Sequence, residues 1–551
     1  MDLRLGQGRR GRLGWLAWVM LAAAWFATLQ VRPMLDPDEG RYAEIPREML
    51  ASGDWITPHL NDLKYFEKPP LQYWATAVAY EVFGLREWSS RLWSVGLAFA
   101  CLPLVSAWVA RLYGRDGALL AVTALALSPF FVIVGHLNLL DGGFTFWLTA
   151  ALLAFTVAQT SPPESSAERR WMLGAWGAGA LAVLSKGIVV GVLAGAALIL
   201  YTLSERDTRT WRRLHLGAGL PLFAAVAAPW FVVVSLRNPS FPGFFFVHEH
   251  FTRFLTTAHQ RVEPWWYFLP LLLLGVLPWI APLARACRRA WAPAVAAASG
   301  AAVPQFKPPK FLLIFAAVTL VFFSASGSKL APYILPMLPV LAAVTGAGSG
   351  AGGEFARHAA RIGAGLVLVI AAGLLVYSAQ RNSYVPHQAL WWALAGALAA
   401  LVAVAMTFRT QPSVQIPAAI VTAASAILAW QCLLCEYTVI PPARSARDLV
   451  STARPFIGAH TPLYSVGQYR ETVSPYLGRT LQLVGYEGEL KFGLQEQPDK
   501  RMALPEFVAR WSAGGEAVAF FDPGVWDEWR RRGLPGRVIA ADNYTVAVSR
   551  L

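Results

Sequence analysis

Long apolar segments, separated by short polar connections, make up most of the first 436 residues. Each segment is close to the roughly 20 mostly apolar residues that a helix needs to cross a bilayer. The first follows an arginine-rich start, but no A-x-A cleavage site comes after it, so we expect an uncleaved anchor rather than a signal peptide. We predict about 13 membrane-spanning helices, near residues 13–31, 91–111, 117–135, 144–159, 171–185, 188–204, 215–236, 266–284, 311–326, 332–348, 361–378, 389–408 and 415–435.

Two polar stretches, residues 32–90 and 237–265, are too long to be simple connections. Helical periodicity in YAEIPREMLASG and PLQYWATAVAYEVFG predicts amphipathic helices in the first stretch, at the membrane surface, with Tyr65 and Tyr73 at the headgroup level. Beyond residue 436, short apolar runs alternate with helical stretches, which predicts a small α/β domain. We therefore expect a transmembrane domain over 1–436, carrying both loops, and a soluble domain over 437–551.

The composition excludes a soluble globular enzyme and a disordered chain, because 56% of the residues are apolar, only 15% are charged and the mean hydropathy is +0.44. The net charge of +14 comes mostly from Arg and Lys in alternate short connections, which places those connections in the cytoplasm and the tail outside. No basic stripe with interleaved aromatic residues points to nucleic acid. The four Cys form neither a disulfide framework nor a zinc pattern.

Ionisable side chains gather at the outer ends of the predicted spans, where such groups are costly and usually functional. Carboxylates beside cations at this edge would suit an anionic, lipid-borne substrate. Simpler explanations compete: Asp38 and Asp141 could each cap a helix, a cation at a span end is often a membrane anchor, and His248 could be packed against neighbouring phenylalanines. The group comprises Asp36, Asp38, Glu39, Arg41, Tyr65, Glu67, Lys68, His136, Asn138, Asp141, Lys186, His248, Glu249, His250, Arg253, His259, Arg261, Glu263, Ser328, Lys329 and Tyr333.

Motifs on the outer side resemble one family in particular. DEGRYAEIPREMLASGDWITPHL, YFEKPP, LLDGG, SKG, HEHFTRF and SKLAPYILP occur in this order, and YEGELKFGLQEQPD follows in the tail. The set is similar to that of the lipid A aminoarabinose transferases, inverting membrane glycosyltransferases of the GT-C class. The first motif alone also resembles the wider protein mannosyltransferase group. The resemblance implies a polytopic α-helical protein of GT-C architecture in the bacterial inner membrane, with its active site and its small α/β domain facing the periplasm.

The resemblance also implies a reaction. Enzymes of this family move 4-amino-4-deoxy-L-arabinose from undecaprenyl phosphate to a phosphate of lipid A, and the reduced surface charge gives resistance to polymyxin and other cationic peptides. The expected partners are the donor, the acceptor and membrane lipids, and we expect a monomer. Two alternatives stay open: a protein O-mannosyltransferase acting on Ser or Thr, and a flippase for polyprenyl-linked sugars. A transporter would show charges at mid-span and paired repeats, which are not visible in this sequence.

The resemblance assigns roles to the outer residues. Asp38 matches the Asp of the first outer loop that is the usual candidate base, and Asp141 would position the substrate. Because the second pKa of an acceptor phosphate is about 6, much of it is already anionic, so Asp38 could act as base or as orienting group. Fixed cations must stabilise the departing phosphate. Lys68 and Arg253 are the first choices, and the second choices are Arg41, Tyr65, Lys186, Lys329 and Tyr333.

We expect no required cofactor. If Lys68 and Arg253 meet at one phosphate, the neighbouring Glu67 and His248 would approach each other and could share a divalent ion such as zinc. Two ligands are a weak pattern for a metal site. Such an ion would more simply be structural than catalytic.

Overall fold

The computed structural model describes residues 2–252, 263–292, 306–348, 352–409, 415–441 and 444–550. The chain divides into two compact units, and each unit is formed from two separate stretches of sequence. The first unit comprises Met1–Leu29 and Ser94–Ile440, and the second comprises Gln30–Trp93 and Pro441–Leu551. Each unit is described by itself below.

This division differs from the one expected at residue 436, because the first long loop joins the tail rather than the membrane helices. Asn61 explains part of the difference: its side-chain amide donates to the Leu481 carbonyl and its carbonyl oxygen accepts from the Leu481 amide, both at 2.8 Å. Arg447 of the tail also pairs with Glu87, and its Nε lies 2.8 Å from Oε1. Hydropathy alone does not reveal polar contacts between segments so far apart in sequence.

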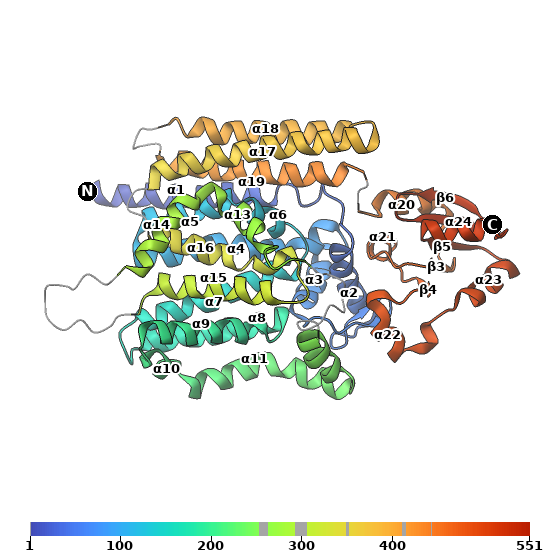
Figure 1. Cartoon of the computed structure of the whole chain (residues 1–551), viewed down its shortest axis with the longest axis horizontal. Helices are drawn as coiled ribbons and strands as arrows, with labels where there is room; N and C mark the ends of the chain where they lie inside the picture. Colours follow the sequence, from blue (N-terminus) through green and yellow to red (C-terminus); the bar gives the residue numbers. More distant parts are fainter. Residues whose placement is uncertain are drawn as a thin grey trace. The chain divides into compact units, whose positions relative to one another are not determined.

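The first unit is a helical bundle, and its long members run side by side in Figure 1. Helix α4 begins in the second unit and continues into the first, and η1 is a π-helix. The helices are α1 (Asp2–Phe26), α4 (Glu87–Tyr113), α5 (Arg115–Leu127), α6 (Pro129–Gly135), α7 (Leu140–Thr160), α8 (Ser166–Lys186), α9 (Val189–Glu205), α10 (Arg209–Arg212), α11 (Leu216–Arg237), η1 (Gly243–Thr252), α13 (Phe268–Val276), η2 (Leu277–Trp279), α14 (Ile280–Trp291), α15 (Pro308–Ala325), η3 (Ala331–Ile334), α16 (Met337–Ala347), α17 (Gly352–Asn382), α18 (His387–Met406) and α19 (Gln415–Val439).

Within the described residues, eight helical segments are long and apolar enough to cross a membrane, and the bent pair α5–α6 makes a ninth if it is one span. The eight are α4, α7, α11, α13–α14, α15, α17, α18 and α19. The remaining predicted spans fall on α8 and on three shorter apolar helices, at Gly14–Phe26, Val189–Glu205 and Ala331–Ala347. Every predicted span therefore coincides with a helix, and the polytopic α-helical fold is confirmed.

Close packing in the first unit depends on small residues, as is usual between membrane helices. A Cβ atom added at Gly117 of α5 would lie 2.5 Å from the carbonyl oxygen of Gly346 in α16, so the backbones meet directly there. The buried positions of α18 are likewise small: Ala389, Ala393, Gly396, Ala400 and Ala403. Their spacing of three or four residues places them on one face of the helix.

Charged residues of the first unit separate to the two ends of its helices. At one end, Arg213 donates to carbonyl oxygens at the end of α7, and Glu205 pairs with Lys310 at the start of α15, at 2.6 Å. At the opposite end, where α7 begins and α8 finishes, Asp141 pairs with Lys186. In this unit, the basic connections and the predicted site residues Asp141 and Lys186 therefore lie at opposite ends of the helices.

The second unit contains a five-stranded mixed sheet, with strand order β4–β3–β5–β7–β6. Strand β3 is parallel to both of its neighbours, and β7 is antiparallel to both of its own. Phe507, Trp511, Phe521 and Trp526 fill the core beside the sheet. Each apolar run of the tail forms a strand, so the predicted α/β domain is confirmed.

The remaining elements of the second unit flank the sheet or come from the first long loop. They are α2 (Asp38–Ser52), β1 (His59–Leu60), β2 (Leu63–Lys64), α3 (Leu71–Phe83), α20 (Arg447–Ala453), η5 (Arg454–Phe456), β3 (Leu463–Val466), α21 (Val473–Leu477), β4 (Gln482–Val484), η6 (Gly488–Leu490), α22 (Lys491–Glu496), η7 (Pro498–Lys500), α23 (Leu504–Ala513), β5 (Ala517–Phe521), α24 (Pro523–Arg531), β6 (Arg537–Ala541) and β7 (Val546–Arg550).

Helix α2 is not the surface helix that its periodicity predicts, because most of its residues are buried, charged ones included. Tyr65 and Tyr73, expected at the headgroup level, are only 3% and 0% exposed. Helix α3 does keep an exposed apolar edge, formed by Val78, Val82 and Phe83. Polar partners account for the difference at α2, since charged side chains are rarely buried unless they are paired.

Candidate active site

The first residue of α2 is Asp38, which follows Pro37 at the cap position. No side chain accepts a capping hydrogen bond there, so Asp38 does not cap the helix in the way that the sequence left open. Its carboxylate lies 3.2 Å from Nη1 of Arg41, and its side chain is 35% exposed. An acidic group in the first turn is also favoured by the helix dipole. Asp38 is therefore a fixed carboxylate that a substrate can reach.

The side chain of Arg41 is buried and surrounded by acids. It pairs with Asp38 and, more closely, with Glu489, while Glu471 lies 3.7 Å away. Its guanidinium carbon is 5.8 Å from the centre of the Tyr65 ring. Burial alone would lower the pKa of Arg41, but the neighbouring Tyr65 and the acids hold it well above its usual value. Arg41 therefore carries a permanent charge that is already engaged by carboxylates.

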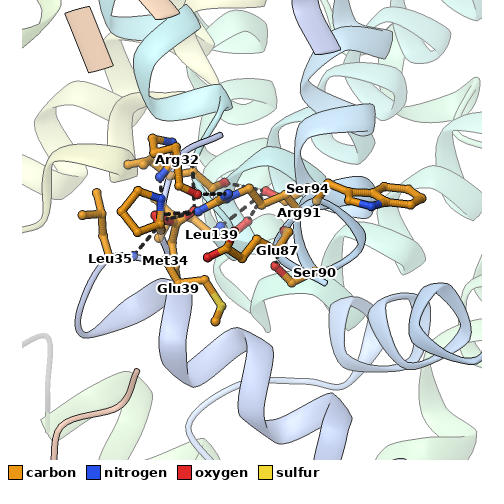
Figure 2. A network of polar contacts seen from close by, with 12 residues as sticks. Arg32, Met34, Leu35, Glu39, Glu87, Ser90, Arg91, Ser94 and Leu139 are labelled. Atoms are coloured by element: carbon orange, nitrogen blue, oxygen red, sulfur yellow. Dashed lines mark hydrogen bonds and ion pairs between the residues drawn. The ribbon is translucent and has the colours of Figure 1, made fainter. Parts of the chain in front are cut away.

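Glu39, next to Asp38, is buried between two arginines (Figure 2). Arg32 donates to its two carboxylate oxygens at 2.6 and 3.1 Å, and Arg91 does so at 2.9 and 3.1 Å. Burial would raise the pKa of Glu39, but both arginines together hold it well below its usual range. The same Arg91 donates to the carbonyl oxygen of Pro33 at 2.8 Å. This network fixes the chain that leads into α2.

Glu67 and Lys68 lie between β2 and α3. Glu67 is 7% exposed, and the Lys68 ammonium, which is half-buried, donates to the main-chain oxygen of Glu67 at 2.8 Å.

The first unit brings together three of the predicted residues. Asp141 lies in the first turn of α7, where it makes no capping hydrogen bond and instead pairs with Lys186 at the end of α8. The Lys186 ammonium lies 4.5 Å from the centre of the Tyr333 ring and 5.2 Å from that of Phe144. An ammonium in contact with a carboxylate and two aromatic faces is strongly held.

Lys329, another predicted phosphate ligand, is buried and bonded to main-chain oxygens instead. Its ammonium donates to Ser326 at 2.7 Å and to Glu263 at 3.0 Å. These contacts tie the end of α15 to the segment before α13.

The predicted metal pair is divided between the two units, Glu67 in the second and His248 in the first. The His248 ring is stacked on Phe244, with centroids 5.2 Å apart, as the packing alternative expects. Among the residues that the structure describes, no three His, Cys, Asp or Glu side chains are grouped to hold a metal. Arg253 lies outside the described residues. The zinc hypothesis therefore stays a prediction.

Sequence reasoning missed the partners that hold α2 in place. Glu471 and Glu489 come from the tail, and Arg32 and Arg91 lie at the two ends of the first loop. Burial raises the pKa of Glu471 to about 8, although Arg41 opposes the shift. Glu489 falls within YEGELKFGLQEQPD, and its place in that motif was the one available signal.

Two known protein families match this chain, one over its first half and one over its tail. Residues 13–245 match the dolichyl-phosphate-mannose-protein mannosyltransferase family, and residues 449–550 match the aminoarabinose transferase C-terminal domain. The undecaprenyl phosphate-alpha-4-amino-4-deoxy-L-arabinose arabinosyl transferase of Erwinia tasmaniensis is 34% identical over 318 residues, 57% of this chain and 55% of the relative. That of Pseudomonas aeruginosa UCBPP-PA14 is 36% identical over 314 residues, 56% of this chain and 54% of the relative. These alignments thus span about half the length of the curated relatives.

A solved structure extends the similarity to almost the whole molecule. ArnT from Cupriavidus metallidurans, crystallised with undecaprenyl phosphate, matches with a TM-score of 0.85 and 33% identity, over 98% of each chain. Its form without ligand matches with a TM-score of 0.84. The chain therefore belongs to the aminoarabinose transferase family.

Proposed function

We propose that this protein transfers 4-amino-4-deoxy-L-arabinose from undecaprenyl phosphate to phosphate groups of lipid A. The observation that carries the proposal is the match over 98% of both chains to ArnT, a protein whose crystal structure is bound to undecaprenyl phosphate. The product would carry less negative charge at the cell surface. Cationic peptides such as polymyxin would then bind it less well, because their attraction to the surface is electrostatic.

In the proposed reaction, an oxygen of the lipid A phosphate attacks C1 of the sugar. The bond from C1 to the donor phosphate breaks, and undecaprenyl phosphate leaves with the electron pair, so the configuration at C1 is inverted. Asp38 is the proposed catalytic residue, because it combines partial exposure with a fixed position on α2. It would accept the remaining proton of the acceptor or orient the acceptor for attack.

Fixed cations would stabilise the charge on the departing phosphate. Lys68 and Arg253 are the proposed first ligands, and removal of one such donor costs on the order of 3 kcal/mol of transition-state stabilisation, about a hundredfold in rate. Arg41 is better suited to holding Asp38 than to binding phosphate, because it already pairs with Asp38 and Glu489 and a third acid, Glu471, lies 3.7 Å away. The scheme uses no metal step, and zinc at Glu67 and His248 stays a separate hypothesis.

Asp141 and Lys186 form the second proposed group. The Lys186 ammonium contacts both the Asp141 carboxylate and the Tyr333 ring. Such a group can orient the hydroxyl and amino groups of a sugar by hydrogen bonds and by contact with a ring face. We assign this group to substrate positioning and keep Lys329 as a further candidate.

The site would face the periplasm from the bacterial inner membrane. The basic connections lie at the end of the first unit opposite Asp141, and basic connections favour the cytoplasmic side. We expect the protein to act as a monomer among membrane lipids.

The experiment is incubation of the purified protein with the polyprenyl-linked amino sugar and lipid A in detergent. Mass spectrometry of lipid A is expected to show a gain of one or two amino-sugar groups. Transfer of sugar to a Ser/Thr peptide instead would support the protein mannosyltransferase alternative, which the match at residues 13–245 keeps relevant. Movement of the donor across vesicles without bond transfer would support a flippase.

A further inference from the structure

We propose that Arg470 is a positioning residue for Asp38. It anchors the turn that precedes α2 through Asp36, so the α/β sheet of the tail holds the reacting carboxylate in place. This inference rests on the proposed function and adds to it a role for the tail in the transfer step.

Both oxygens of the Asp36 carboxylate are engaged by the same short segment of the tail. Oδ2 accepts from Nε of Arg470 at 2.8 Å, and Oδ1 accepts from the main-chain amide of Thr472 at 2.9 Å. The amide of Asp36 donates to the Arg444 carbonyl oxygen, also at 2.8 Å. Asp36 is therefore tied to the tail by its side chain and by its backbone, two residues before Asp38.

Arg470 is itself fixed by the turn between β6 and β7. Its Nη1 donates to Asp542 at 2.5 Å, and its guanidinium carbon lies 5.6 Å from the centre of the Tyr544 ring. The other oxygen of Asp542 accepts from the amides of Tyr544 and Thr545 at 2.9 and 2.8 Å. Arg470 thus bridges an edge of the sheet to the start of α2, and its side chain is only 6% exposed.

Gly40 shows that the two backbones are in direct contact. A Cβ atom there would lie 2.5 Å from the main-chain carbon of Glu471 and 2.6 Å from the amide nitrogen of Thr472. The first turn of α2 therefore has no room to shift toward this segment. Because Arg41 in that turn also contacts Asp38, a movement of the Arg470–Thr472 segment would displace the carboxylate.

The two acids of the Asp-Pro-Asp sequence consequently have different roles. Both oxygens of Asp36 are bonded to the tail, whereas Asp38 is one-third exposed and contacts one arginine. Reacting groups that are misplaced by about 1 Å lose roughly a hundredfold in rate. Loss of Arg470 should therefore slow the chemical step and leave donor binding unchanged.

The test compares Arg470→Gln with wild type and with Arg447→Gln. Arg447 is a matched control, since it also joins the tail to the first loop, but through Glu87 and the Val31 carbonyl oxygen rather than through Asp36. The readouts are kcat for transfer to lipid A, the dissociation constant of undecaprenyl phosphate and the thermal unfolding midpoint. For Arg470→Gln we expect kcat to fall about ten- to a hundredfold, with the dissociation constant within about twofold of wild type.

Two further variants keep the test decisive if Arg470→Gln does not fold. Arg470→Lys should restore part of the lost kcat, because an ammonium can still pair with Asp36 but cannot bridge to Asp542. Asp542→Asn weakens the anchor of Arg470 and should lower kcat less than Arg470→Gln does. An unchanged kcat in all three variants would overturn the inference.

The remaining outcomes are also distinct. If Arg447→Gln lowers kcat as much as Arg470→Gln does, the tail acts through general attachment, and the positioning role is wrong. If wild type transfers no sugar to lipid A, the proposed function fails, and this inference fails with it. An active wild type with an unaffected Arg470→Gln variant contradicts this inference alone.

Discussion

Three neighbouring acids at the start of α2 have three different environments. Asp36 is anchored by Arg470, Asp38 is partly exposed beside Arg41, and Glu39 is buried between two arginines. The residue types are alike, so their chemistry is set by partners that come from distant parts of the sequence. Only Asp38 combines accessibility with a fixed position, which is what a reacting carboxylate requires.

Glu471 gives a prediction about pH. Burial raises its pKa to about 8 from the usual 4.5, with Asp36 and Glu489 adding to the shift and Arg41 opposing it. Between these values the folded state holds a proton that the unfolded state has lost, so stability falls as the pH rises. Glu471→Gln should therefore flatten the dependence of the unfolding midpoint on pH between about 4.5 and about 8.

The measurement is the thermal unfolding midpoint of wild type and of Glu471→Gln at several pH values between about 4.5 and about 8. Glu506→Gln, which changes an exposed acid on α23, serves as a control and should follow the wild type. A Glu471→Gln curve parallel to wild type across this range would show that Glu471 is ionised in the folded protein.

Asp141 and Lys186 should behave as one functional pair. Asp141→Asn and Lys186→Met are each expected to lower kcat/KM for transfer by about tenfold or more, because each leaves its partner without a counter-charge. The double variant should lose little beyond the single ones. Steady-state kinetics of the four proteins measures the coupling, and fully additive losses would contradict a shared role.

At the scale of single residues, the sequence identifies some members of the candidate site and misses others. Asp38, Asp141 and Lys186 stand beside recognisable motifs at span ends, and the structure puts Asp141 and Lys186 in contact. Arg470 and Glu471 carry no local signal. Their partners in the first loop, Asp36 and Arg41, lie more than 400 residues away, and a pairing of that kind is visible only in three dimensions.

At the scale of elements, α2 is held by polar contacts as well as by buried apolar residues such as Ile45 and Met49. Its alternation of apolar and charged residues resembles that of a helix on a membrane surface, yet Glu39 and Glu44 are buried with arginines as partners. The pattern indicates a helix correctly but does not tell which face meets water. Figure 2 shows Arg32 and Arg91, the two arginines that pair with the buried Glu39.

Removal of the Glu39 carboxylate should destabilise the protein strongly. Glu39→Gln leaves two buried arginines without their counter-charge, and breaking such a buried pair costs about 3–5 kcal/mol. The unfolding midpoint in detergent should fall accordingly. The matched control is Glu506→Gln, because its ion pair with Arg510 is exposed and contributes little. Equal midpoints for the two variants would contradict a structural role for the Glu39 network.

At the scale of the whole molecule, the sequence predicts the kinds of element better than their grouping. Span lengths and the apolar runs of the tail identified the helices and strands, because hydropathy and period are local properties. The compact units were not predictable in the same way. Residues 30–93 belong with the tail through hydrogen bonds such as that of Asn61 with Leu481.

The proposed orientation predicts which positions a membrane-impermeant thiol reagent reaches. In a background with the four native Cys replaced, Gln495→Cys in the tail should be labelled from the periplasm, and Thr208→Cys beside a basic connection should not. Both positions are exposed, so burial does not decide the result. Labelling of Thr208→Cys in intact cells, with Gln495→Cys protected, would reverse the proposed topology.

The most direct test of the central claim is a comparison of wild type and Asp38→Asn in the purified transfer assay. The two side chains are nearly equal in size, so the change removes the charge and leaves the fold of α2. We predict that wild type adds the amino sugar to lipid A, while Asp38→Asn transfers at least about a hundredfold more slowly and still binds undecaprenyl phosphate. Equal transfer rates for the two proteins would contradict the assignment of Asp38 as the reacting carboxylate.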